Sequence, residues 1–154
     1  MTRFENVSGS EGSKFPGPPA PVFTTNPFVS GPPLGQRRVA IVTTGGLHTR
    51  NDRPFLYDDA DYYRIIPGNI QANDLFMSHF SSGFDRSAFQ RDCNVIFPID
   101  RLREMAKEGI IGNLADFHYS FRSRNARESD PEPIREIAGF LKKDKVDAVL
   151  LFPV

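Results

Sequence analysis

The stretch that decides the fold is Arg38-Val39-Ala40-Ile41-Val42-Thr43-Thr44-Gly45-Gly46. A short continuous apolar run bounded by polar and glycine residues is typical of a strand that is buried on both faces. A second run of this kind occupies residues 146–152. Helical patterns lie between the two runs, and strands that alternate with helices indicate a parallel sheet. We therefore predict a single α/β domain over residues 38–154, with a mostly parallel sheet flanked by helices.

Two amphipathic helices are expected in the second half of the chain. The first ends at Gly109 and has apolar residues at helical spacing, namely Ile99, Leu102, Met105 and Ala106. The second begins at Pro131, with Ser129 or Asp130 as its cap. Its apolar face is expected to consist of Ile134, Ile137, Ala138 and Leu141.

Shorter elements are less strongly specified. Residues 94–97 are expected to form a strand that stops at Pro98, and residues 64–66 and 74–79 are expected to form short strands. Residues 86–92 have weak helical character, and residues 122–129 form a charged loop. The pattern of residues 113–121 favours neither a helix nor a strand.

The N-terminal part of the chain differs in composition from the rest. Residues 1–37 contain seven prolines and five glycines, which prevent a regular hydrogen-bonded ladder. The same stretch carries Phe4, Phe15, Phe23 and Phe28, which a solvated linker would not need. We expect an extended arm whose residues 21–34 pack on the domain; the alternative is a wholly disordered tail.

Composition excludes several classes of protein. The 19 Lys+Arg residues balance the 19 Asp+Glu residues, which argues against a general nucleic-acid or anionic-membrane binder. We expect neither a membrane span nor a secretory signal, because no apolar run is long enough for a span and residues 1–13 lack an apolar core. A single cysteine, Cys93, excludes an internal disulfide. These features predict a cytoplasmic protein.

The segment from Thr43 through Thr44 and Gly45 to Gly46 directly follows the first buried strand. Its backbone N–H groups could form a nest that holds an anion, such as a substrate carboxylate. The segment matches neither a phosphate-binding P-loop nor the dinucleotide fingerprint. A simple tight turn explains it equally well.

The three histidines, His48, His79 and His118, each follow an expected strand or its loop. One of them could act as an acid or base, and each could instead bond loop backbone. Together with Asp85 or Asp92 they could bind zinc or iron in a metal-dependent hydrolase, although no local ligand spacing supports a metal site and none is assigned.

Two further residues have a reactive side chain. Cys93 is a poor candidate for a nucleophile, because the neighbouring Asp92 raises the pKa of its thiol. Arg101, between Asp100 and Arg103 at the start of a helix, could bind a substrate carboxylate; an exposed helix face is the alternative.

Five segments in a fixed order carry a resemblance to a known family: residues 39–48, 92–103, 109–112, 118–120 and 146–154. Together they resemble the selenoprotein B family of glycine/sarcosine/betaine reductases and D-proline reductase, especially its short stand-alone members. The resemblance implies an oxidoreductase that cleaves a C–N bond of a small amino-acid-like substrate. It also implies other complex subunits and a thioredoxin-type electron donor as partners.

The family nucleophile is a selenocysteine, or a cysteine in some members, placed just after the strand that resembles residues 146–154. The resemblance therefore implies that a selenocysteine belongs directly beyond Val154, that the 154-residue chain is incomplete at its C-terminus, and that it is inactive by itself. No cofactor is expected within the chain. The assignment of Thr43, Thr44, Gly45, Gly46 and Arg101 to substrate binding, and of His48, His79 and His118 to catalysis, rests on position and chemistry. The alternative is a non-catalytic subunit of the same fold that binds a small anion or has a regulatory role.

Overall fold

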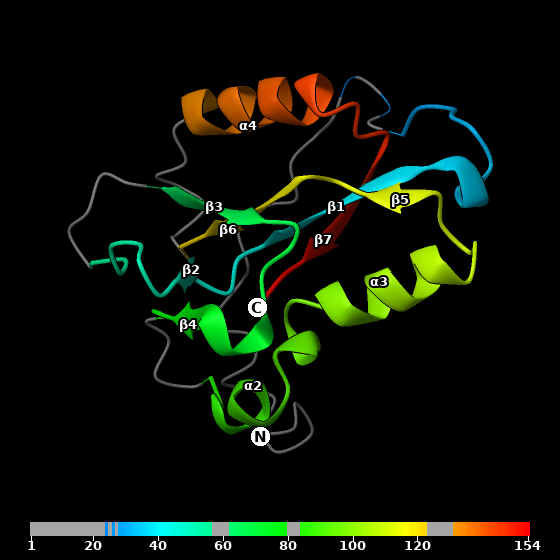
Figure 1. The fold of residues 1–154 in the computed structure, drawn as a ribbon. Coiled ribbons are helices and arrows are strands. Elements are labelled where there is room, and N and C mark those ends of the chain that lie inside the picture. The colour runs from blue at the N-terminus through cyan, green and yellow to red at the C-terminus, as the bar shows by residue number, and fades with distance from the viewer. Residues whose placement is uncertain (1–23, 25, 27, 57–61, 80–83, 123–130) are drawn as a thin grey trace, which may run out of the picture. The chain divides into compact units, whose positions relative to one another are not determined.

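A computed structural model describes residues 24, 26, 28–56, 62–79, 84–122 and 131–154 (Figure 1). The chain divides into two units, Met1–Ser30 and Gly31–Val154. In the described residues of the first unit, the backbone N–H of Phe28 donates to the side chain of Asn26. Most of the expected N-terminal arm, the Ser129 or Asp130 cap and nearly all of the loop at 122–129 lie outside the described residues.

The first predicted strand, β1 (Arg38–Thr43), is the centre of the main sheet. Along one edge it pairs in parallel with β5 (Asn113–Leu114) and then with β6 (Phe117–Phe121). Along the other edge it pairs in parallel with β7 (Ala148–Phe152), in a register that joins Val39 to Ala148 and Thr43 to Phe152. Both apolar runs therefore form strands, as predicted, and the structure shows that the two strands are neighbours.

The sheet is mixed, and this corrects the prediction of a mostly parallel one. Strand β3 (Tyr63–Pro67) pairs antiparallel with β6, and β2 (Leu47–Thr49) pairs antiparallel with β4 (Leu75–Met77) in a second, two-stranded sheet. Parallel pairing of consecutive strands needs a long crossover, usually helical. The described residues between β2 and β3 contain no helix, so the chain reaches the sheet edge in the opposite direction.

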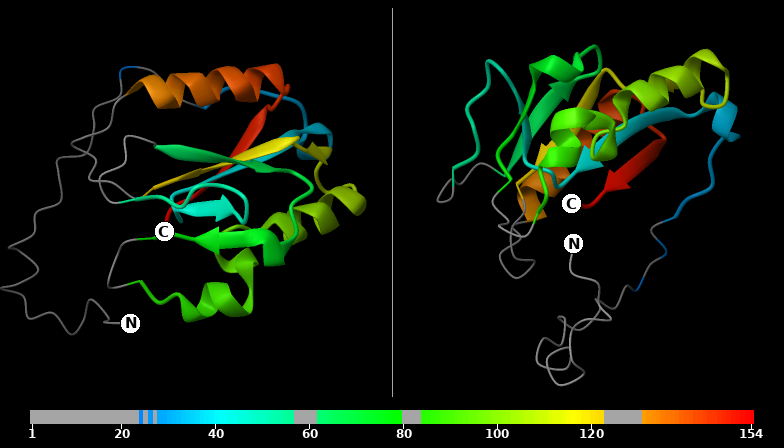
Figure 2. Two further views of the ribbon diagram at one scale, coloured as in Figure 1. Left: turned by 60° about the vertical axis from the view of Figure 1, so that its left-hand side comes forward. Right: turned by 90° about the horizontal axis from the view of Figure 1, so that it is seen from below.

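Helices cover both faces of the main sheet. Figures 1 and 2 show α4 (Pro131–Lys143) on one face and α3 (Ile99–Lys107) on the other, while α2 (Ser87–Arg91) lies near β4. The core cluster fills the α3 side and includes Ile41, Ile66, Phe97, Ile99 and Leu102. On α4 the expected apolar stripe is only partly covered, because Ile137 is buried whereas Ile134 is 54% exposed.

The predicted end of α3 is confirmed. Gly109 has a φ of 73°, a conformation that glycine adopts without a Cβ penalty. The N–H groups of Gly109 and Ile110 donate to the carbonyls of Ala106 and Met105, which satisfies the last turn of the helix.

The expected strand at 94–97 is wrong. This segment contains a 3-10 turn, η4 (Cys93–Val95), because the Asp92 side chain accepts a hydrogen bond from the Asn94 N–H at 2.9 Å. The Asn94 side-chain oxygen in turn accepts from the N–H of Asp100 at 3.0 Å. Local side-chain bonds of this kind compete with a strand ladder.

Two further 3-10 turns are η2 (Leu34–Gln36) and η3 (Ala72–Asp74); η3 and β4 together replace the single strand expected at 74–79. Residues 113–121, which the pattern left unassigned, supply β5 and β6. Within the described ranges, none of the helices has the length and apolar character required to cross a bilayer.

Candidate functional site at the carboxyl ends of the parallel strands

The loop after β1 is fastened to the end of β7. The N–H of Thr44 donates to the carbonyl of Phe152 at 3.2 Å. The Thr44 hydroxyl oxygen accepts from the N–H of Val154 at 2.9 Å and lies 3.4 Å from the carbonyl oxygen of the same residue. The carboxyl ends of β1 and β7 therefore meet where parallel sheets place their ligands.

The remaining N–H groups of this loop are also occupied. Gly45 donates to the Thr43 hydroxyl at 3.1 Å, and Gly46 donates to the carbonyl of Phe121 at 2.9 Å. Gly46 has a φ of 65°, and a Cβ there would lie 3.1 Å from the carbonyl oxygen of Ser78. The segment is a tight turn between β1 and β2, and an anion could use its amides only by displacing these bonds.

His79 lies next to this turn and is 4% exposed. Its ring contacts Phe84 at a centroid distance of 4.8 Å, and a ring N–H donates to the carbonyl of Thr44. The other ring nitrogen, Nδ1, is buried and has no hydrogen-bond partner among the described residues. Burial, followed by the positive charge of Arg86, lowers the pKa of His79. Burial therefore favours the neutral form of this imidazole, and its Nδ1 is unpaired within the described part of the chain.

Both ring nitrogens of His48, in contrast, have partners. Nε2 lies 3.0 Å from the Ser78 hydroxyl, and Nδ1 lies 2.9 Å from the Thr49 carbonyl. The ring also stacks on Phe76. Through these contacts the His48 side chain connects β2 to β4 and to Ser78, which follows β4.

His118 is fully buried within the sheet. Its Nδ1 accepts a hydrogen bond from the N–H of Ile41 at 3.0 Å, and its ring packs edge-on against Phe97. Burial lowers the pKa of His118 to about 4. The imidazole therefore accepts from a β1 amide that lies between the points where β5 and β6 pair with that strand. Its Nε2 is buried and has no hydrogen-bond partner among the described residues.

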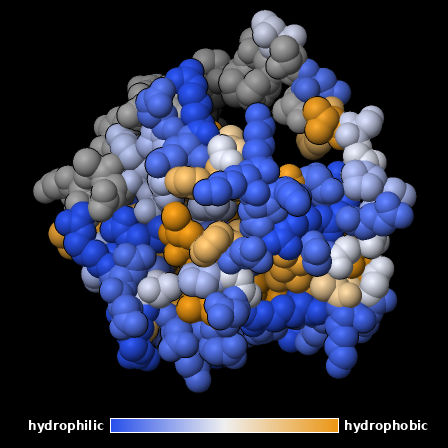
Figure 3. Space-filling model, turned by 45° about the horizontal axis from the view of Figure 1, so that its top comes forward, coloured by the Kyte–Doolittle hydropathy of each residue, from blue (hydrophilic) through white to orange (hydrophobic). Residues whose placement is uncertain are grey.

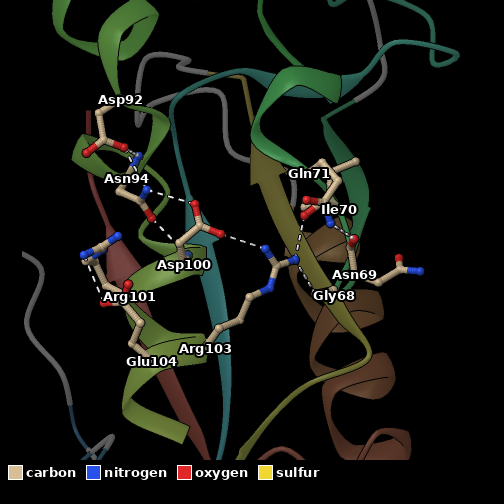
Figure 4. A network of polar contacts seen from close by, with 10 residues as sticks. All are labelled: Gly68, Asn69, Ile70, Gln71, Asp92, Asn94, Asp100, Arg101, Arg103 and Glu104. Atoms are coloured by element: carbon tan, nitrogen blue, oxygen red, sulfur yellow. Dashed lines mark hydrogen bonds and ion pairs between the residues drawn. The ribbon is translucent and has the colours of Figure 1, made fainter. Parts of the chain in front are cut away.

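Arg101 lies apart from these groups, on α3. Figure 4 shows its guanidinium turned toward Glu104, with which it forms an exposed ion pair at 3.0 Å. A half-buried connection is made by Arg103, which bonds Asp100 at 2.8 Å and the carbonyls of Gly68 and Ile70 at 2.9 and 2.6 Å (Figure 4). Arg101 thus lies on an exposed helix face, which was the alternative to its predicted role in binding a substrate carboxylate.

Neither Cys93 nor the alternative of a metal site gains support from the described residues. Cys93 is 5% exposed, and burial, followed by the charges of Asp100 and Asp92, raises the pKa of its thiol. In the described part of the chain, no three His, Cys, Asp or Glu side chains gather as metal ligands.

Sequence reasoning missed the residues that position His79. Ser78 donates its N–H to the carbonyl of Gly46 at 2.9 Å, and the Arg86 guanidinium bonds the carbonyl of His79. The available signal was positional, since Ser78 and His79 directly follow β4 just as Thr44 and Gly45 follow β1.

Comparisons with known proteins identify the relatives of this chain. At 38% identity over 120 residues it is similar to D-proline reductase subunit gamma of Acetoanaerobium sticklandii, covering 77% of this chain and 49% of that protein. At 34% identity over 145 residues it is similar to sarcosine reductase complex component B subunit beta of Peptoclostridium acidaminophilum, covering 86% of this chain and 32% of the relative. At 29% over 124 residues it is similar to glycine reductase complex component B subunit gamma of Symbiobacterium thermophilum, covering 77% and 28%.

The chain thus spans about half, or less, of the length of these curated relatives. No solved structure matches it. Residues 23–153 match the family described as glycine/sarcosine/betaine reductase selenoprotein B. The chain therefore belongs to the glycine/sarcosine/betaine reductase selenoprotein B family.

Proposed function

We propose that this chain is a component of a reductase complex that cleaves a C–N bond of a small amino-acid-like substrate, with electrons from a thioredoxin-type donor. Family membership and the names of the relatives, which are subunits of proline, sarcosine and glycine reductases, support a reductase-complex role. The reaction, the donor and the partner subunits are part of the proposal.

The observation that carries the proposal is the placement of His79. A buried imidazole, whose pKa is lowered and whose Nδ1 has no partner among the described residues, lies beside the turn that binds the backbone of Val154. An unsatisfied buried acceptor is costly unless a ligand or reacting group uses it. We infer that the chemistry takes place at this edge of the sheet.

The nucleophile that the family requires is proposed to be a selenocysteine, or a cysteine, that directly follows Val154 in the complete protein. A residue at that position would leave the sheet at the Thr44 turn, next to His79. The selenium or sulfur atom would form a bond to the substrate carbon, and the electron pair of the C–N bond would leave with the amine.

His79 is proposed as the group that moves the proton in this step. When the nucleophile arrives as a selenol or thiol, Nδ1 accepts its proton and then returns it to the departing amine nitrogen. His48 and His118 are assigned supporting roles in the proposal, because His48 has partners at both ring nitrogens and Nδ1 of His118 holds a β1 amide. The backbone N–H groups of the Thr43–Gly46 turn already have hydrogen-bond acceptors. We therefore propose that this turn positions the end of β7 and does not bind an anion.

Two experiments test the proposal. Sequencing the gene past the codon for Val154 should reveal an in-frame UGA followed by further coding sequence; UAA or UAG at that position would remove the proposed selenocysteine. In the complete protein assembled with its partners, His79→Gln should lower kcat by about a hundredfold or more. Unchanged kcat in a variant whose far-UV circular dichroism is native would dismiss the role of His79.

A further inference from the structure

A second feature lies on the opposite face and at the opposite edge of the sheet, between α4 and strands β3 and β6. It is a hollow of about 360 Å³, which we call the α4 groove. Its floor is apolar and consists of Ile65, Phe117, Tyr119 and Phe140. Its rim carries three charged residues, Asp116, Lys143 and Asp144.

The strand register explains why apolar side chains gather there. Ile65 pairs with Tyr119 and Pro67 pairs with Phe117, so Ile65, Tyr119 and Phe117 point to the same face, the one that α4 covers. Coverage is incomplete, because Ile65 is 40% exposed and Phe117 is 47% exposed. Figure 3 shows apolar surface among hydrophilic residues when this side of the molecule is turned forward.

The two carboxylates on the rim share one arginine. The Arg38 guanidinium lies 2.9 Å from Asp116 and 2.5 Å from Asp144, so both carboxylates are engaged in ion pairs with this side chain. Asp144 is further fixed by the N–H of Asp116, at 2.7 Å from its other oxygen. Lys143 has no acidic partner among the described residues, so the groove presents one unpaired cation beside an apolar floor.

We propose that the α4 groove docks a segment of another subunit of the reductase complex, one in which an aromatic or branched aliphatic side chain stands next to a carboxylate. The apolar side chain would cover Ile65 and Phe117, and the carboxylate would pair with Lys143. The exposed floor favours a protein partner, because small-molecule sites enclose most of their ligand, whereas aromatic side chains at the surface are typical of protein interfaces. Arg38 already fixes the side chains of Asp116 and Asp144, so less side-chain entropy is lost when a partner binds at this rim.

This inference rests on the proposed membership of a complex, and the experiment separates the two. The full chain is expressed in its native host with the photo-crosslinking residue p-benzoylphenylalanine at position 117, and the products are identified by mass spectrometry. The matched control carries the same residue at position 110, because Ile110 is 44% exposed and follows α3 on the other face. Co-elution of the unmodified chain with the other subunits is measured in parallel.

The inference predicts crosslinks from position 117, and not from position 110, to an acidic and apolar segment of another complex subunit. Lys143→Glu should reduce their yield by about tenfold, whereas Lys142→Glu, one residue outside the groove, should not. Crosslinks to residues 1–30 of the same chain, to a second copy, or equally from both positions would overturn the docking surface. Failure of the unmodified chain to co-elute with any reductase subunit would overturn both proposals, whereas co-elution without the 117-specific crosslink would overturn only the groove.

Discussion

The hydroxyl of Thr44 accepts a hydrogen bond from the backbone N–H of Val154, although 110 residues separate the two. This bond, together with that from the Thr44 N–H to Phe152, fixes the end of β7 against the turn that follows β1. It determines where any residue after Val154 would leave the sheet, and thus where the proposed nucleophile would meet His79.

Removal of this hydroxyl should loosen the end of β7. Thr44→Val is expected to lower the free energy of unfolding by about 1 kcal/mol, because one half-buried hydrogen bond is lost. Hydrogen exchange at the Val154 amide should accelerate in the same variant. Thr49→Val is the control, since the Thr49 hydroxyl makes no hydrogen bond with the described residues; equal effects of the two substitutions would contradict the prediction.

The structure makes clear which sequence signals were sufficient. β1 and β7 were predictable because each is a short continuous apolar run, and α3 and α4 were predictable because their apolar residues recur at helical spacing. Residues 113–121 gave no such signal, because His118 and Ser120 are polar and yet fully buried. They are buried because each bonds a backbone amide, Ile41 N–H and Leu47 N–H respectively, and composition does not reveal such partnerships.

The same limit applies to the candidate site. The sequence placed all three histidines near strand ends, and only the three-dimensional contacts separate them. Both ring nitrogens of His48 have partners, whereas His79 and His118 each have one buried, unpaired ring nitrogen. His79 differs from His118 because it lies beside the turn after β1 and not within the sheet. Two of the turn amides, those of Thr44 and Gly46, donate to the carbonyls of Phe152 and Phe121, which lie in strands distant in sequence. Hydrogen bonds to such distant acceptors cannot be inferred from the two glycines of the turn alone.

His118 should make stability depend on pH. Its pKa is lowered from 6.5 to about 4, so the unfolded chain takes up a proton in that range while the folded chain does not. The contribution is fully present above pH 6.5 and is lost as the pH falls toward 4, by up to about 3 kcal/mol. Burial lowers the pKa of His79 as well, which adds to the same trend.

The variant His118→Leu isolates this contribution. It should flatten the dependence between pH 6.5 and 4 in urea unfolding, and at pH 7 it should cost about 1–3 kcal/mol, because the Ile41 N–H loses its acceptor. A pH dependence as steep as that of the unsubstituted chain would refute the assignment.

Two arginines on α3 should behave differently. Arg103→Met is expected to lower the free energy of unfolding by about 2 kcal/mol, because its bonds to Asp100 and to two carbonyls connect α3 to the loop after β3. Arg101→Met removes only an exposed pair with Glu104 and should change stability by less than about 0.5 kcal/mol. Chemical denaturation of both variants decides the matter, and a larger effect for Arg101 would contradict the network in Figure 4.

Two glycines provide a further pair. A Cβ on Gly68 would lie 2.5 Å from the carbonyl oxygen of Ala115, so Gly68→Ala should destabilise by about 1–3 kcal/mol. Gly139 lies within α4 and a Cβ there would meet nothing within 4 Å, so Gly139→Ala should stabilise by up to about 1 kcal/mol. Thermal melts should therefore shift in opposite directions, and a shared direction would show that the loop after β3 adapts to the added methyl group.

The central position of β1 also governs how the chain can be made. Its three parallel neighbours begin at residues 113, 117 and 148. β1 is synthesised before all three, so its backbone hydrogen bonds cannot be completed until β7 has been made. Distant pairings of this kind form slowly. During synthesis the apolar segment around Ile41 therefore remains exposed. We expect nascent chains of this protein to bind ribosome-associated chaperones.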